Sequence, residues 1–254
     1  KNPRLTTTYG TGLLIKDALE RGVKKILLGI GGSATNDGGA GLASALGVRL
    51  LDKQGQELPP GGAALAELAQ IDMSELNPLL AKVKIEVACD VQNPLCGPQG
   101  ASAVYGPQKG AQPGDIHDLD RALRNLGEHL SAITGCDVLE LPGGGAAGGV
   151  GAGSVGFLGA QLRPGSEIIL EVSQAENKIK AADLVLTGEG RTDFQTAYGK
   201  VPVGVAALAR KYHEPELVIS GSVDGSPDAL SEHAISTCFS DSEGPVTLEE
   251  AFVK

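Results

Sequence analysis

Glycine is the residue that most limits what this chain can fold into. The 254 residues include 37 glycines, which is about twice the ~7% usual in soluble proteins. They do not follow the three-residue period of collagen, and no serine and glutamine bias of a flexible linker accompanies them. Because glycine lets the backbone come close to bulky or anionic groups, this composition indicates loops that bind a small ligand.

Length and charge exclude several classes of protein. A chain of 254 residues with 41% hydrophobic content can bury the core of one large domain or of two modest ones. No apolar run reaches the ~18 residues of a membrane helix, so we expect no membrane association. The formal net charge is −10, whereas a nucleic-acid-binding protein normally carries a basic face. We therefore expect no nucleic-acid partner.

The cysteines indicate the compartment. Cys89, Cys96, Cys136 and Cys238 are widely spaced, form no C-x-x-C pair and have no paired histidine ligands beside them. We interpret them as reduced, mostly buried thiols of a cytoplasmic protein without a structural zinc. The chain opens on a polar segment unlike a signal peptide, and both ends resemble cut ends, as in a fragment.

The first half of the chain contains two junctions between a strand and a polar loop. Residues 24–29 predict a buried strand, and a glycine-rich loop over residues 30–41 leads from it to a short helix ending at Leu46. Residues 84–89 predict a second strand, which ends in a polar segment. A glycine-rich loop between a strand and a helix presents free backbone N–H groups, which can bind an anion.

The clearest helix begins at Asp115, because apolar residues recur there at spacings of three and four and form one stripe. These residues are Ile116, Leu119, Leu123, Leu126, Leu130 and Ile133. Glycine makes up most of residues 142–153, and we expect no regular element in that tract.

From about residue 167 onward, strands and helices alternate. The predicted strands cover residues 168–172, 183–187, 216–220 and 234–239, and helices are predicted over residues 173–180, 202–212 and 227–233. Such alternation indicates a parallel sheet with helices on its faces. We predict an α/β protein of two α/β domains, residues 1–178 and 179–254.

The loop of residues 29–41 is the first candidate binding site. Its small or polar candidates are Gly31, Gly32, Ser33, Thr35 and Asn36. The glycines permit close approach, the polar side chains can donate to ligand oxygens, and Asp37 can accept from a hydroxyl or hold Mg²⁺. The alternative is a flexible surface turn.

The segment after the second strand is the next candidate. Asp90 follows the strand directly and Asn93 lies three residues later. Groups at the end of a strand lie where open α/β sheets bind their ligands. An ordinary Asx turn before Pro94 is the alternative.

Residues 187–200 form the third candidate, because they combine two carboxylates, two cations and several hydroxyl or amide groups. The cations Arg191 and Lys200 could neutralise phosphoryl oxygens, and Asp193 could take a proton or ligate a metal. The remaining candidates are Gly188, Glu189, Gly190, Gln195 and Thr196. A loop with purely structural salt bridges is the alternative.

The glycine tract is a weak candidate for dinucleotide binding. Residues 143–156 contain two matches to G-x-G-x-x-G, but so repetitive a composition produces such matches by chance. A backbone cradle for phosphate or carboxylate is the better interpretation. The sequence contains no Walker A motif, no protein-kinase signature and no G-x-S-x-G, and its four histidines lie in or beside predicted helices, away from the loops.

Five segments, in the order in which they occur, resemble those of the bacterial glycerate kinase family of the type I, two-domain kind. They are TTTYGTGLLIKDAL, GIGGSATNDGGAGLASALG, VACDVQNPLCGPQGASAVYGPQKGA, LPGGGAAGGVGAG and ADLVLTGEGRTDFQTAYGKVPVGVA. The resemblance implies phosphorylation of glycerate with ATP and Mg²⁺, with 2-phosphoglycerate as the product associated with the bacterial branch. The chain departs from the family at Phe194, where glycine is usual, and at Ala197-Tyr198 in place of Leu-His.

The resemblance also implies how the two domains are built. The glycine-rich segments would form an inserted α/β domain, and the later residues would form part of a Rossmann-like or flavodoxin-like parallel-sheet domain. The family's N-terminal βα segment and the extreme C-terminus would be missing from this chain.

Chemistry and position then suggest roles for the candidates. We expect the loops of residues 31–41 and 187–200 to face each other across a cleft between the domains. Asp193 is the leading candidate for the general base on the acceptor hydroxyl, with Asp37 as the reserve.

The remaining charged candidates would serve the phosphates. Asp90 and Glu189 are the candidates for Mg²⁺, bound directly or through water. Arg191 and Lys200 would stabilise the charge on the γ-phosphoryl group.

Two other functions stay open at this point. One is an NAD(P)-dependent oxidoreductase that uses the glycines of residues 143–156, and the other is an inactive fragment that acts only as a ligand-binding module. The sequence is compatible with a homo-oligomer, and it does not reveal which hydroxyl of glycerate would be phosphorylated.

Overall fold

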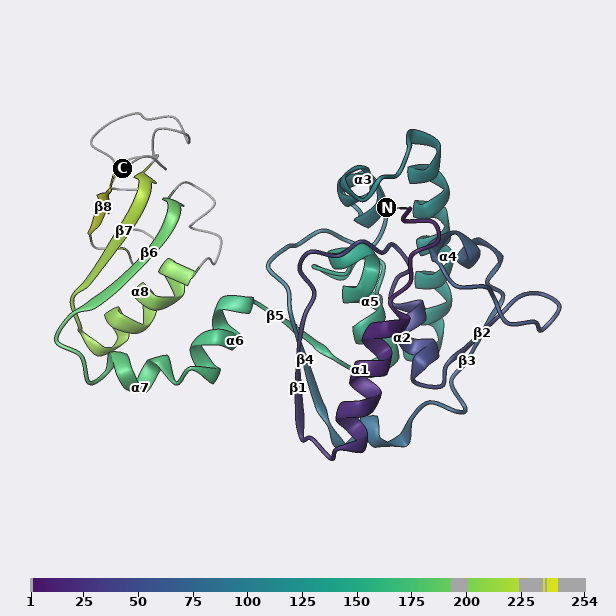
Figure 1. Cartoon of the computed structure of the whole chain (residues 1–254), viewed down its shortest axis with the longest axis horizontal. Coiled ribbons are helices and arrows are strands. Elements are labelled where there is room, and N and C mark those ends of the chain that lie inside the picture. The colour runs from purple at the N-terminus through teal and green to yellow at the C-terminus, as the bar shows by residue number, and fades with distance from the viewer. Residues whose placement is uncertain (1, 193–200, 224–234, 236, 242–254) are drawn as a thin grey trace. The chain divides into compact units, whose positions relative to one another are not determined.

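The computed structural model describes residues 2–192, 201–223, 235 and 237–241 of the chain. The chain forms two compact units, Lys1–Arg163 and Pro164–Lys254, which we call unit 1 and unit 2. Each unit combines helices with a parallel sheet (Figure 1). The prediction of two α/β domains is therefore confirmed.

Unit 1 contains two sheets. Its elements in chain order are α1 (Tyr9–Glu20), β1 (Lys25–Gly29), α2 (Ala40–Ala45), β2 (Arg49–Leu51), the 3-10 helix η1 (Gly62–Glu67), β3 (Gln70–Asp72), η2 (Pro78–Lys82), β4 (Lys84–Ala88), α3 (Ala101–Tyr105), η3 (Pro107–Lys109), α4 (Pro113–Thr134), α5 (Ala146–Leu158) and β5 (Gln161–Arg163). β4 is the central strand of the parallel sheet β1-β4-β5, whereas β2 and β3 form an antiparallel pair. The strands predicted over residues 24–29 and 84–89 are confirmed to within one residue.

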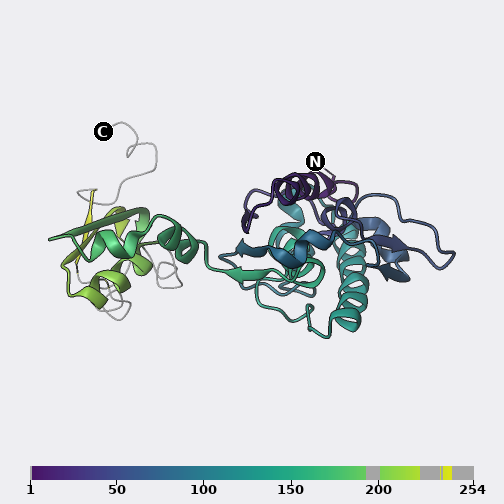
Figure 2. The ribbon, with the colours of Figure 1, turned by 90° about the horizontal axis from the view of Figure 1, so that it is seen from below.

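Helix α1 covers one face of the parallel sheet (Figure 2). Ile15 and Leu19 of α1 pack in one apolar cluster with Ile85 and Val87 of β4. Because successive side chains of a strand point to opposite faces, Glu86 lies on the other face of the sheet.

Glu86 is fully buried among three cations. Its carboxylate lies 2.6 Å from Lys84 Nζ and 2.9 Å from both Lys25 Nζ and Arg163 Nη1. Hydrogen bonds from Lys84 and Lys25 hold the pKa of Glu86 at about 2, against the opposing effect of burial. A buried carboxylate is tolerated only with such partners, so the cluster fixes the three strands to one another.

Helix α4 confirms the predicted apolar stripe and builds a second core. Leu119, Leu123, Leu126 and Leu130 are buried, whereas Ile133 in the last turn is 49% exposed. The helix begins slightly before Asp115, because the side chains of Gln112 and Asp115 form a capping box around its first turn.

The glycine tract differs from the prediction, because α5 occupies most of it. Its first turn is irregular, with positive φ at Ala147, Gly148 and Gly149. The rest is helical, and a Cβ at Gly153 would lie 2.1 Å from the carbonyl oxygen of Gly38. Close packing against another backbone therefore outweighs the poor helix propensity of glycine.

The described part of unit 2 contains one parallel sheet of order β6-β7-β8. Its elements are α6 (Gly165–Val172), α7 (Ala175–Ile179), β6 (Val185–Thr192), α8 (Val201–Tyr212), β7 (Glu216–Val223) and β8 (Cys238–Ser240). Helices α6 and α7 both contact α8, so the units divide earlier than the predicted boundary after residue 178. The helix predicted over residues 227–233 lies outside the described residues.

The strand predicted over residues 168–172 is wrong, because this segment is helix α6. Pro164 at the N-cap position and Glu167 in the first turn are signals of a helix start. Ile168 is buried while Ile169 and Val172 are more than half exposed. The signals of a helix start thus outweigh the β preference of the branched side chains.

The loop predicted to begin at residue 187 starts later, because β6 continues to Thr192. Pairing with β7 extends as far as Thr192 and Val223. Within the described ranges of both units, no helix is both long and apolar enough to cross a lipid bilayer.

We expect Glu86→Gln to lower the unfolding temperature at pH 7, because it leaves three cations around an uncharged side chain. The folded pKa of about 2 lies below the ordinary value of 4.5, so the stabilisation is complete above pH 4.5 and is lost as the pH falls toward 2. Thermal unfolding at pH 7 and pH 3 should show the gap between wild type and variant narrowing at the lower pH. A gap independent of pH would contradict the ionic account.

We expect Gly153→Ala to destabilise the chain by about 1–3 kcal/mol or more, because the added methyl group overlaps the backbone at Gly38. Gly10 in α1 is the control, since a Cβ there would meet no atom within 4 Å, and Gly10→Ala should stabilise by about 0.5–1 kcal/mol. Denaturant titration measures both. Equal midpoints for the two variants would refute the close-approach explanation.

Candidate functional site

A cavity of about 450 Å³ lies where β1 and β4 end. Gly29 and Ala88 are paired at the ends of these adjacent parallel strands. The cavity is lined by residues 30–33 after β1, residues 88–91 at the end of β4, and residues 105, 108–109 and 146–147. The carboxyl edge of a parallel sheet is the usual place for a ligand in this class of fold.

The cavity brings together two of the segments that the sequence singled out. Gly31, Gly32 and Ser33 line it beside the exposed Asp90. Among the described residues, no group accepts a hydrogen bond from the backbone N–H groups of Gly31, Gly32 and Ser33. The loop therefore offers an array of donors to an anion.

Asp37 lies close to this loop in sequence but is fully buried. Its carboxylate accepts hydrogen bonds from Thr8 N (2.7 Å), Thr8 Oγ1 (2.9 Å), Gly39 N (3.2 Å) and Gly41 N (3.3 Å). These bonds join the start of α1 to the start of α2. A carboxylate so occupied favours a structural role over that of a base.

Asn36 is also fully buried. Its Nδ2 donates to Ser102 Oγ at 3.0 Å, and its Oδ1 has no hydrogen-bond partner in the described part of the chain. The neighbouring Thr35 contributes its carbonyl oxygen to the hydrogen bond from Lys109 Nζ. Thr35 and Asn36 hold the loop through these hydrogen bonds, and neither residue lines the cavity.

Asn93 likewise supports the wall of the cavity. Its Oδ1 accepts from the hydroxyl of Tyr105 at 2.7 Å, and its Nδ2 donates to the carbonyl of Gln99 at 2.8 Å. Tyr105 itself lines the cavity. These contacts fix Tyr105 in place.

The sequence analysis missed Lys109, which ends η3 and lines the same cavity. The residue is only 3% exposed, and Nζ donates to the carbonyl oxygen of Thr35 at 2.9 Å. Burial lowers its pKa to about 8, although the charge of Asp37 acts in the opposite direction. Its segment, GPQKG, follows a helix, whereas the sequence argument considered only loops that follow strands.

The thiols near the site are not activated. The four cysteines are free, as predicted, and Cys89 and Cys96 are buried. Burial raises the pKa of Cys89, which lines the cavity, and raises that of Cys96 to about 12. Neither thiol is suited to nucleophilic catalysis.

The candidates of the third segment lie in unit 2. Gly188, Glu189, Gly190 and Arg191 belong to β6, and Glu189 Oε1 accepts from Thr192 Oγ1 at 3.0 Å. The candidates that lie outside the described residues are Asp193, Gln195, Thr196 and Lys200. The predicted approach of residues 31–41 and 187–200 stays a prediction.

The described residues contain no group of three histidine, cysteine, aspartate or glutamate side chains that could hold a metal. Mg²⁺ is often bound by only one or two carboxylates together with substrate phosphates. Asp90 and Glu189 therefore remain predicted ligands.

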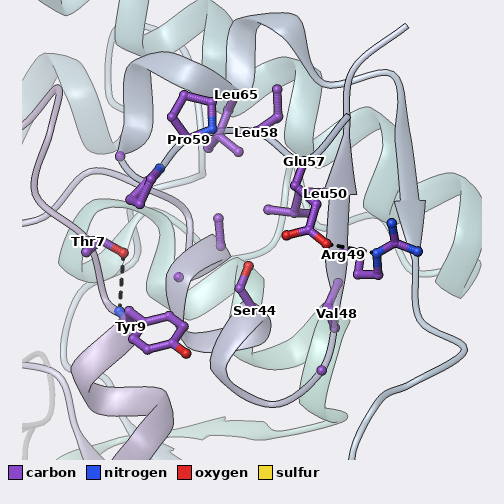
Figure 3. A pocket seen from close by; sticks show the side chains of 15 residues that line it. Thr7, Tyr9, Ser44, Val48, Arg49, Leu50, Glu57, Leu58, Pro59 and Leu65 are labelled. Carbon is purple, nitrogen blue, oxygen red and sulfur yellow. Dashed lines mark hydrogen bonds and ion pairs between the residues drawn. The ribbon is translucent and has the colours of Figure 1, made fainter. Parts of the chain in front are cut away.

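A second cavity, of about 380 Å³, lies beside the start of α1 and the strand β2 (Figure 3). Arg49 Nε donates to Glu57 Oε1 at 2.9 Å on one side of it, and Tyr9 N donates to Thr7 Oγ1 at 3.2 Å on the other. It contains none of the predicted site residues. Its cation is already paired, so the first cavity is the better candidate for an anionic ligand.

Comparison with known proteins identifies the family of the chain. The profile of the glycerate kinase family matches residues 1–254. The chain is 51% identical over 251 residues to a glycerate kinase of Halalkalibacterium halodurans and 48% identical over 252 residues to a glycerate 2-kinase of Escherichia coli K12, in each case over 99% of this chain and 66% of the relative.

A solved structure is similar in both sequence and fold. A crystal structure assigned as glycerate kinase 2 of Salmonella typhimurium LT2 matches with a TM-score of 0.84 and 51% identity. The match covers 99% of this chain and 66% of that one. The chain thus spans just under two thirds of the length of these relatives.

We expect Asp37→Ala to lower stability by roughly 2–5 kcal/mol, because four donors would lose their acceptor. Asp37→Asn keeps one acceptor oxygen and should therefore lose less stability. Urea unfolding measures both, and Asp183→Ala at an exposed position before β6 is the control. An unchanged midpoint for Asp37→Ala would show that these bonds do not stabilise the fold.

Proposed function

The chain belongs to the glycerate kinase family, and we propose that it acts as an ATP-dependent kinase that phosphorylates a hydroxyl of D-glycerate. A relative of 48% identity is named glycerate 2-kinase, which supports 2-phosphoglycerate as the product. Glycerate is a small anion, and ATP carries four charges. Both ligands require a site with local positive potential in a chain of net charge −10.

The observation that carries this proposal is the cavity at the ends of β1 and β4. Its volume of about 450 Å³ falls in the usual range of roughly 300–1,000 Å³ for small-molecule sites. The free N–H groups of Gly31, Gly32 and Ser33 suit a carboxylate or phosphoryl oxygen. Family membership and this array of N–H donors both support a small anionic ligand.

Asp90 fits the requirement for a magnesium ligand. It is an exposed carboxylate at the cavity, and Mg²⁺ binds through one or two such groups. Glu189 is the second proposed ligand. When bound, Mg²⁺ neutralises phosphate charge.

Residues at and after the end of β6 would accept the proton and stabilise the charge of the transferred group. Asp193, which follows this strand in sequence, is the proposed general base that accepts the hydroxyl proton. Arg191 and Lys200 would stabilise the negative charge of the γ-phosphoryl group. Asp37 is the weaker candidate for the base because its carboxylate is enclosed by four donors.

The environment of the glycine tract argues against an oxidoreductase. Helix α5 comes after α4 in the chain and not directly after a strand, whereas a dinucleotide fingerprint requires a strand before it. In addition, Gly148 and Gly153 pack against the backbone of residues 35–39. A thermal-shift panel in which NAD(H) stabilised the chain and ATP did not would favour the oxidoreductase.

The test is a coupled ADP-release assay on D-glycerate with identification of the product. We expect ADP release that depends on D-glycerate and yields 2-phosphoglycerate, and we expect Asp193→Asn to lower kcat by about 10²-fold or more. Asp183→Asn, on the same unit before β6, is the control and should retain activity.

Two outcomes would contradict the proposal. Binding of D-glycerate and ATP without any release of ADP would favour the ligand-binding module. Full activity of Asp193→Asn would show that the base lies elsewhere.

A further inference from the structure

Lys109 is a buried cation that forms no ion pair within the described part of the chain. Its side chain is 3% exposed, and no carboxylate in the described ranges lies within 4.0 Å of Nζ. Its hydrogen bond to the carbonyl of Thr35 uses one of three N–H donors. Lysine is almost never fully buried unless it is paired, because burial of an unpaired charge is costly. The charge of Asp37 offsets this cost only in part, because the pKa of Lys109 is still lowered to about 8.

Backbone donors lie beside Lys109 in the cavity, which is also lined by the exposed carboxylate of Asp90. The N–H groups of Gly31, Gly32 and Ser33 find no acceptor among the described residues. The hydroxyl of Tyr105 already donates to Asn93. A negatively charged group is therefore the ligand that complements this side of the cavity.

A strained residue borders the same cavity. Ala147 lines it with φ of 55°, in the left-handed region that alanine rarely adopts. Such outliers concentrate at functional sites. The backbone strain at Ala147 does not depend on charge, and it indicates the same cavity as the buried charge of Lys109.

We propose that the ammonium group of Lys109 binds an oxyanion of the substrate, either the carboxylate of D-glycerate or a phosphoryl group of ATP. The identity of these two ligands rests on the proposed function, whereas the oxyanion site itself does not. Lys109 would then exclude neutral analogues, because only an anion compensates its buried charge. A charge-assisted hydrogen bond of this kind contributes more to binding than a neutral one.

The experiment compares Lys109→Met with wild type. Methionine has a similar length and carries no charge, and Lys53→Met in the exposed turn after β2 is the matched control. Thermal shift and calorimetry at pH 7 would measure the binding of inorganic phosphate, D-glycerate and ATP. We expect Lys109→Met to remain folded and to lose at least about tenfold in affinity for phosphate and for one of the two substrates.

The arms of the experiment separate the sources of the oxyanion. A loss confined to D-glycerate assigns the carboxylate, and a loss confined to ATP assigns the phosphoryl group. If wild type binds phosphate through Lys109 but binds neither substrate, the proposed function fails and the oxyanion site stands. Unchanged affinity of Lys109→Met for all three probes would overturn the inference.

A measurement on wild type covers the case in which Lys109→Met fails to fold. Because burial lowers the pKa of Lys109 to about 8, affinity for the oxyanion should fall as the pH rises from 7 to 9. The nearby titratable groups are Asp37, Asp90, Cys89 and Tyr105, and burial raises the pKa of Cys89 and of Tyr105 above their ordinary values of 9.0 and 10.0. Affinity that stays constant across this range would contradict the role of Lys109.

Discussion

Direct contact between two backbones is the constraint on which unit 1 depends. Helix α5 approaches the loop before α2 so closely that a Cβ at Gly148 would lie 2.1 Å from the carbonyl oxygen of Thr35. A Cβ at Gly62 would lie 2.2 Å from the carbonyl oxygen of Asn36. Glycine on both sides, together with the four hydrogen bonds to Asp37, fixes the second half of the loop. The N–H groups of the first half, residues 31–33, form no hydrogen bond with the described residues and can therefore donate to a ligand.

This arrangement explains how an acidic chain can offer a site to anions. The net charge of −10 describes the whole chain, whereas binding depends on the potential inside one cavity. There, backbone dipoles and the buried ammonium of Lys109 provide local positive charge. The close packing of glycine therefore serves the site as well as the fold.

Much of the fold and part of the site could be predicted from the sequence. Periodicity located α4, and the strand-to-loop junctions located Gly31 and Asp90 at one cavity. Helix α5 was missed because its glycines are stabilised by contacts with distant residues, which local propensity does not include. Lys109 was missed for a related reason: its importance comes from its burial, and burial is a property of the tertiary structure.

The central claim is that the carboxyl edge of β1 and β4 binds the anionic substrate. Amide NMR spectra of the ¹⁵N-labelled chain, recorded during titration with D-glycerate and then with ATP, test it most directly. The account predicts that at least one ligand shifts the resonances of Gly31, Gly32 and Ser33, whose N–H groups line the cavity. Saturable shifts confined to the second cavity, around Thr7 and Ser44, would contradict it.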